Sequence, residues 1–325
     1  MRNLTRGFTL TELMIALVLS TFLVAGIGSV YVANVRTSEV NNFMSQAQQA
    51  SQISFQLLTH DAQHAGFTGC GNMISERVVN ALRIDASHWW AHWNQFGGVT
   101  IYSGLQGYES AAGAVPLFGG AGISPKTGSD AVRMMYGRGI SASVVSHNLG
   151  ANPPLVINQN QPRLVANDIV IGCDSKMAVI FQITGIVGNN INHGVGVGAP
   201  GNNHNNFGFG ANGVNFPQSL TPDAGIIVPL ESVAWFIGTE SGVSSLYRVA
   251  LINGVMRNEI ILSGVEDMEL QYLQLGSPNY VNANAVNSWE QVVAIRVTLI
   301  MENSTQNPVS QNLRTISQVI NLRNH

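Results

Sequence analysis

The sequence predicts an α+β fold, in which a long N-terminal α-helix with a membrane-embedded first half packs on a C-terminal antiparallel β-rich globular domain. Residues 8–35 are apolar except for short polar side chains, and Glu12 is the only charged residue among them. Residues 36–65 carry apolar side chains at spacings of three and four, the period of an amphipathic helix. From residue 66 onward, short apolar runs alternate with glycine and asparagine, as strands and loops require.

The first half of the predicted helix is long enough to cross a membrane. A helix of about 20 apolar residues spans the ~30 Å of bilayer hydrocarbon, and the apolar run continues from Leu13 to Val35. Arg2 and Arg6 precede this run and favour a cytoplasmic N-terminus. We therefore expect a single-pass membrane protein with its C-terminal domain on the opposite side.

The second half of the helix, residues 36–65, has a predicted apolar face that needs a globular partner. No proline occurs between residues 8 and 64, so both halves are expected to form one helix of about 55 residues that stops near Gly66 and Gly69. The predicted face consists of Val40, Phe43, Met44, Ala47, Ala50, Ile53, Leu57 and Leu58.

The β-rich domain is expected to span residues 66–325. Predicted strands lie at 131–137, in a pair at 168–184 around a turn at Asp174–Ser175, in a hairpin at 246–262, and at 267–272, 293–299 and 314–323. Asn253-Gly254 is the turn of that hairpin, because Asn-Gly favours primed two-residue turns. The Gly/Asn-rich segment 188–216 is expected to be a loop too polar and too flexible to pack a core.

Composition narrows the class of protein. The charged residues make up only 10% of the chain and the net charge is −3, so the overall balance gives nucleic-acid binding no electrostatic support. Cys70 and Cys173 are the two cysteines of the chain. Beyond a membrane anchor they would meet an oxidising compartment, which favours a disulfide. Two free thiols or a metal pair remain the alternatives.

The densest aromatic patch is His88-Trp-Trp-Ala-His-Trp, residues 88–93. Trp89, Trp90 and Trp93 could form a surface contact site, and the alternative is core or loop packing. The two histidines of the patch are four residues apart, but the motif brings no third type of ligand, so we predict no metal site and no cofactor.

Motifs of catalysis are missing from the sequence. It contains no Gly-x-Ser-x-Gly, P-loop, His-Glu-x-x-His or dinucleotide-binding fingerprint. Its carboxylates are few and scattered along the chain. The protein is therefore not expected to be an enzyme.

The N-terminal stretch Arg-Gly-Phe-Thr-Leu-Thr-Glu-Leu-Met-Ile-Ala-Leu, residues 6–17, closely resembles the class III signal of type IV prepilins and pseudopilins. The resemblance implies that a prepilin peptidase removes residues 1–7 by cutting between Gly7 and Phe8 and that the new Phe8 amine is N-methylated. It also makes Glu12 an assembly residue, whose buried charge could pair with the amine of a neighbouring subunit. In the alternative, a plain signal anchor, Glu12 would snorkel to the membrane interface.

Further segments are similar to PilW-type minor pilins, namely residues 64–70, 172–184, 262–272 and 289–300. Membership implies a pilin-like fold, an inner-membrane subunit with a periplasmic domain, and a pilus component after assembly. The implied task is pilus assembly in a priming or tip complex, with other minor pilins and the major pilin as partners. The alternatives are a minor pseudopilin of a type II secretion system and a tip-located adhesin or ligand-binding module.

Overall fold

The structure is a computed structural model, and it describes residues 9–70, 78–83, 88–90, 95–96, 99–100, 104–110, 123–139, 142–149, 154–159, 163–209, 215–216, 218–252, 255–303 and 311–323. The chain divides into two compact units. The first comprises residues 1–49 and 303–314, and the second comprises residues 50–302 and 315–325.

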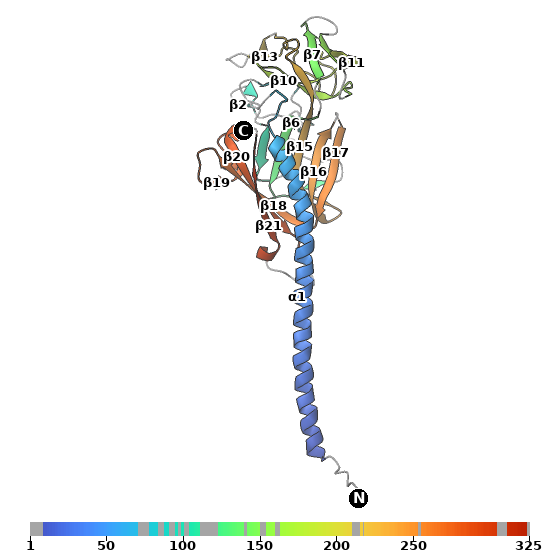
Figure 1. Cartoon of the computed structure of the whole chain (residues 1–325), viewed down its shortest axis with the longest axis vertical. Helices are drawn as coiled ribbons and strands as arrows, with labels where there is room; N and C mark the ends of the chain where they lie inside the picture. The colour runs from blue at the N-terminus through green and yellow to red at the C-terminus, as the bar shows by residue number, and fades with distance from the viewer. Residues whose placement is uncertain are drawn as a thin grey trace. The chain divides into compact units, whose positions relative to one another are not determined.

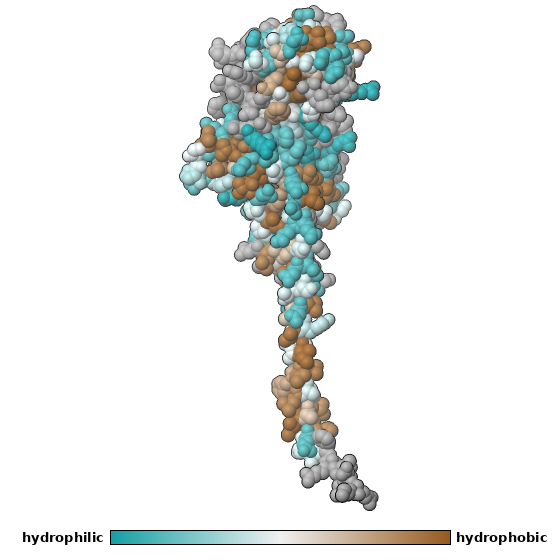
Figure 2. Space-filling model, viewed as in Figure 1, coloured by the Kyte–Doolittle hydropathy of each residue, from teal (hydrophilic) through white to brown (hydrophobic). Residues whose placement is uncertain are grey.

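A single helix, α1 (Leu10–His64), forms the first part of the chain (Figure 1). Its 55 residues confirm the predicted continuous helix. Figure 2 shows apolar side chains over most of the visible surface of its first half, which is long and apolar enough to cross a membrane. The hydroxyls of Ser20, Thr21 and Ser29 each donate to the backbone carbonyl three residues earlier, at 2.7–2.9 Å. Polar groups in this half are thus satisfied within the helix, as a hydrocarbon environment demands.

The last turns of α1, which belong to the second unit, bury a face that overlaps only in part with the predicted one: Leu58 is buried as predicted. Ile53 and Leu57 were expected on the buried face, but they are 61% and 40% exposed. The buried positions recur every three or four residues and are Ser51, Ser54, Phe55, Leu58, Asp61, Ala62 and Ala65. The prediction was wrong for Ile53 and Leu57 because it ranked faces by apolarity, whereas two serines and an aspartate are buried here.

The second unit is built around β15 (Ile226–Glu240), which belongs to a thirteen-stranded sheet. Most pairings are antiparallel, as predicted, although β1 and β10 pair in parallel. The other strands of this sheet are β1 (Val78–Asn80), β4 (Leu105–Tyr108), β5 (Ser124–Pro125), β6 (Ala131–Gly137), β7 (Ala142–His147), β8 (Leu155–Ile157), β9 (Ile169–Cys173), β10 (Ala178–Gln182), β11 (Gly185–Val187), β12 (Asn190–Asn192), β16 (Val243–Ile252) and β17 (Val255–Ser263).

A four-stranded antiparallel sheet carries the C-terminal part of the same unit. It contains β18 (Val265–Gln274), β19 (Tyr280–Val281), β20 (Val292–Met301) and β21 (Thr315–Asn321), in the order β19-β18-β20-β21. Short 3-10 helices lie at Ala283–Ala285, Trp289–Gln291 and Gln311–Leu313. Two small strand pairs complete the described strands, β2 (Gln95–Phe96) with β3 (Val99–Thr100) and β13 (Gly208–Phe209) with β14 (Asn215–Phe216).

The strands predicted from alternation are confirmed. The pair around Asp174 corresponds to β9 and β10, and the hairpin corresponds to β16 and β17, in which Ile252 is the register partner of Val255. Its predicted turn at residues 253–254 lies outside the described residues. Strands β6, β18, β20 and β21 account for the remaining predictions.

The expectation that segment 188–216 packs no core was wrong. Ile191 and Phe207 are fully buried in a hydrophobic cluster with Phe181. Two buried amide side chains bond the segment to β10. Gln182 accepts from Gly201 N–H at 2.8 Å and donates to the carbonyls of Ala199 and, outside the segment, Asn167. The side chain of Asn202 bonds both backbone groups of Gln182, at 2.7 and 2.8 Å. A polar composition thus supplies the hydrogen bonds that a long loop otherwise lacks.

Two connections hold the chain that follows α1 against the sheet. Cys70 and Cys173 form a disulfide with a Cα–Cα distance of 5.9 Å, which confirms the predicted bridge. Gly66 has a left-handed φ of 82° and donates its N–H to the Met135 carbonyl at 2.9 Å. A Cβ atom on Gly104 would lie 2.3 Å from the Gly66 nitrogen, so the backbones approach as closely as glycine allows.

Candidate functional site

The first candidate feature is the start of α1, where Thr9 and Glu12 cap the helix reciprocally. Glu12 N–H donates to Thr9 Oγ1 at 3.3 Å, while Glu12 Oε2 accepts from Thr9 N–H at 3.0 Å and from the Thr9 hydroxyl at 2.8 Å. This arrangement is a capping box, which satisfies backbone N–H groups that have no partner inside a helix. Glu12 therefore has a structural task within its own chain, which the sequence analysis missed although the Thr-x-x-Glu spacing signals it.

The carboxylate of Glu12 keeps capacity for a further partner. Both of its capping bonds go to Oε2, and Oε1 accepts no hydrogen bond from the residues that the structure describes. A carboxylate can accept about four hydrogen bonds. Gly7 and Phe8, the residues of the predicted cleavage site, lie outside the described residues.

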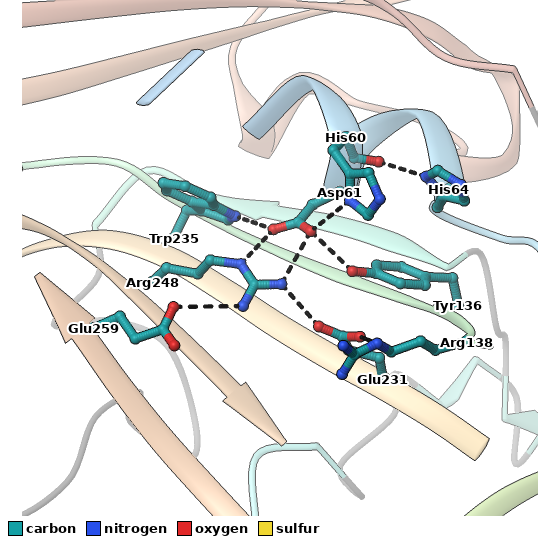
Figure 3. A network of polar contacts seen from close by, with 9 residues as sticks. All are labelled: His60, Asp61, His64, Tyr136, Arg138, Glu231, Trp235, Arg248 and Glu259. Atoms are coloured by element: carbon teal, nitrogen blue, oxygen red, sulfur yellow. Dashed lines mark hydrogen bonds and ion pairs between the residues drawn. The ribbon is translucent and has the colours of Figure 1, made fainter. Parts of the chain in front are cut away.

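The second candidate feature is a polar network that fixes the end of α1 to the central sheet (Figure 3). The carboxylate of Asp61, 1% exposed, is its centre. Asp61 Oδ2 accepts from Trp235 Nε1 and from Arg248 Nε, both at 2.8 Å. Asp61 Oδ1 accepts from the Tyr136 hydroxyl at 2.8 Å and from a terminal nitrogen of Arg248 at 3.0 Å. Arg248 thus grips the carboxylate with two parallel hydrogen bonds, the strongest geometry for this pair.

The charges of the network are balanced. Arg248 also donates to Glu231 at 2.8 Å, and Arg138 forms an ion pair with the other oxygen of Glu231 at 3.0 Å. Two carboxylates therefore face two guanidinium groups. Glu259 lies 3.9 Å from Arg248 at the half-exposed edge of the network and adds little.

Titration of the network follows from its burial. Burial by itself would lower the pKa of Arg248, but the hydrogen bonds and charge of Asp61, joined by Glu231, raise it above its ordinary value. Burial, followed by the negative charges of Asp61 and Glu231, raises the pKa of Tyr136. Arg248 and the Tyr136 hydroxyl are therefore both protonated at neutral pH and act as donors to the carboxylates.

The strand register explains how residues far apart in sequence meet. Trp235 is the cross-strand partner of Arg248, and Glu231 is the cross-strand partner of Tyr136. Because side chains alternate along a strand, Glu231 and Trp235, four residues apart on β15, lie on the same face. That face carries the donors that meet Asp61. The sequence analysis did not find this network, since single polar residues in separate apolar strands form no motif.

The aromatic patch does not form the predicted surface site. Trp89 is 3% exposed and packs in a core cluster with Phe236 and Tyr247. Trp90 packs edge-on against it, and Trp93 lies outside the described residues. The burial of Trp89 is stabilised by Arg133, which donates to its carbonyl at 2.9 Å. Among the described residues, no group of three or more His, Cys, Asp or Glu side chains is arranged to hold a metal ion.

One family model matches the N-terminal part of the chain, and another matches its C-terminal part. Residues 2–28 match the family model of the prokaryotic N-terminal methylation motif, and residues 234–320 match that of the type IV pilus-assembly protein W. Together the two matches support a type IV minor pilin of the PilW type. No curated protein matches it.

Each of the two matched regions contains some of the residues of the candidate features. The methylation motif contains Glu12, and the PilW region contains Trp235 and Arg248. Asp61 and Tyr136 lie in neither region, so the network joins PilW-specific strands to the helix. The protein takes part in pilus assembly, and its apolar helix with the prepilin motif anchors it in the inner membrane. The motif implies processing by prepilin peptidase and a role with other pilus components.

Proposed function

We propose that this minor pilin is cut between Gly7 and Phe8, methylated on the Phe8 amine, and then incorporated into a priming or tip complex with other minor pilins and the major pilin. The observation that carries the proposal is the capping box, which starts the helix at Leu10, directly after the proposed mature N-terminus.

The domain is proposed to be periplasmic before assembly and extracellular afterwards. Arg2 and Arg6 favour a cytoplasmic leader, which leaves the chain after the membrane span outside the cytoplasm. The Cys70–Cys173 disulfide supports that orientation, because disulfides persist in oxidising compartments. No enzymatic activity is proposed.

Glu12 is proposed to have two tasks, capping its own helix through Oε2 and pairing with the cationic N-terminal amine of a neighbouring subunit through Oε1. The pairing would neutralise a carboxylate that is costly in hydrocarbon. It would also set the axial position of one subunit against the next, because only one register brings the two charges together.

Mass spectrometry of the purified chain tests the processing step. The expected N-terminus is N-methyl-phenylalanine at position 8, and a chain that still begins at Met1 would refute the proposal. Non-piliated cells lacking this minor pilin should regain surface pili when the natural chain is restored, as counted by electron microscopy.

Two substitutions separate the tasks of Glu12. Glu12→Ala removes the cap and the charge, whereas Glu12→Gln retains a side-chain oxygen suitable for a capping box and removes the charge alone. Both variants should be cleaved, and both should fail to incorporate into pili. Normal incorporation of Glu12→Gln would show that capping is the only task of this residue.

A further inference from the structure

Two histidines stand one turn apart at the C-terminal end of α1. His60 and His64 are both exposed, and their ring centroids are 4.4 Å apart. Figure 3 shows them on successive turns beside the ring of Tyr136. An i, i+4 pair of histidines on one helical face is the spacing with which metalloprotein helices supply two imidazole ligands to one ion.

The hydrogen bonds of both rings leave the same nitrogen available. His64 Nδ1 lies 2.7 Å from the carbonyl oxygen of His60, and a carbonyl can only accept, so this nitrogen carries the proton. His60 Nδ1 lies 3.4 Å from Asp61 Oδ1, an oxygen that also accepts from Tyr136 and Arg248, so Nδ1 is the donor in this contact. With Nδ1 used as the donor, each ring leaves its Nε2 atom for coordination.

This pattern is the outer shell that metal-binding histidines have. Such histidines commonly donate their second ring N–H to a carboxylate or to a backbone carbonyl, which fixes the tautomer and the ring orientation. Here His60 uses the carboxylate of Asp61 and His64 uses the carbonyl of His60. Asp61 is itself held by Tyr136, Trp235 and Arg248, so the outer shell is rigid.

The local field favours a cation. Helix α1 ends at His64, and the C-terminus of a helix carries partial negative charge. The Asp61 carboxylate lies directly behind the His60 ring. The ring of Tyr136, with its centroid 5.7 Å from that of His64 and 6.5 Å from that of His60, forms one wall. Both imidazoles are thereby restricted in the rotamers that they can adopt.

We propose that His60 and His64 bind one late first-row transition-metal dication through their Nε2 atoms, with water completing the coordination. Imidazole ligands suit Zn²⁺, Ni²⁺ and Cu²⁺, and affinity rises to Cu²⁺ in that series. The site is open on its solvent side, so the ion could also accept a ligand from a partner surface. Two protein ligands, rather than the three or four of closed structural sites, make the binding reversible.

The test is titration of Cu²⁺ into the untagged full-length protein in detergent micelles at neutral pH. Isothermal calorimetry gives the affinity, and electron paramagnetic resonance counts the coordinated nitrogens. The variants are His60→Gln, His64→Gln and the double substitution. His204→Gln is the matched control, because His204 belongs to a different part of the domain and bonds the Asn206 carbonyl at 3.1 Å.

The natural protein and the His204 control should show a two-nitrogen signal from this site. Each single variant should bind Cu²⁺ at least about tenfold more weakly and show one site nitrogen, as losses in metal shells commonly do. The double variant should lose the site and keep only background binding. An unchanged affinity in the double variant, or a two-nitrogen signal that survives both single substitutions, would overturn the proposal.

Discussion

Replacing Arg248 with methionine should weaken the attachment of the end of α1 to the sheet and lower the stability of the domain. The substitution keeps a similar side-chain length. Arg248 makes three hydrogen bonds to two buried carboxylates, two to Asp61 and one to Glu231. Removing one partner of a buried ion pair costs about 3–5 kcal/mol, because the remaining charge is left uncompensated. Asp61 would keep the Trp235 and Tyr136 donors and the His60 contact at 3.4 Å, but it would lose its cationic partner.

For a domain of this size, 1 kcal/mol shifts the midpoint of thermal unfolding by about 2–4 °C, so Arg248→Met should lower it by about 6–20 °C. Near-ultraviolet circular dichroism of the full chain in detergent would report the transition, since Trp235 donates to the same carboxylate. Arg257→Met is the matched control: Arg257 is exposed on β17, and its loss should change the stability by no more than about 0.5 kcal/mol.

A double variant shows whether the lost stability comes from charge. Asp61→Asn combined with Arg248→Met removes one buried carboxylate together with its cation, and it should be more stable than the sum of the two single changes predicts. Additive effects, or an Arg248→Met midpoint within about 2 °C of the natural protein, would refute the reasoning that this network holds the helix on the sheet.

The remaining predictions concern other buried polar groups. Burial lowers the pKa of both His147 and His193 to about 4. Because the unfolded chain then binds more protons in acid, thermal stability should fall between about pH 6.5 and 4. His193→Leu should flatten this dependence of the unfolding midpoint on pH, and an equally steep dependence would contradict the assignment. Burial raises the pKa of Asp130 to about 6, so the ionised carboxylate destabilises the folded state above that pH. Asp130→Asn should therefore increase the free energy of unfolding at neutral pH by about 1 kcal/mol, after allowance for solvent screening. A decreased free energy of unfolding in chemical denaturation would refute this. Gln182→Leu should speed hydrogen exchange of the Gly201 amide about 10–100-fold, whereas unchanged exchange would show that the side chain does not hold the segment.

Features with a local period or a local motif could be predicted from the sequence. Apolar continuity gave the helix its length, and sequence patterns located β16, β17, β18, β20 and β21. Two cysteines beyond a membrane anchor indicated one disulfide. Each of these signals lies within a few neighbouring residues or in a single pair. The processing motif belongs to the same class, because a peptidase reads it as a short linear segment.

Features that depend on tertiary pairing could not be predicted. The buried face of α1 near Asp61 was missed because Ser51 and Ser54 score as surface residues, although both are 2% exposed or less. Segment 188–216 was misjudged for the same reason. Its asparagines and glycines indicate a solvated loop until the amides of Gln182 and Asn202 are seen to bond its backbone at Gly201 and Gly194. In both places polar groups are buried because a partner satisfies them.

The two halves of α1 therefore make contacts of two different kinds, apolar in the first half and hydrogen-bonded in the second. In the first half, contact between apolar surfaces is non-directional, so lipid can be exchanged for neighbouring helices without a change in the fold of the subunit. In the second half, Asp61 accepts hydrogen bonds from three strands, β6, β15 and β16, and these bonds are directional. A helix held in this way has one rotation about its axis relative to the sheet.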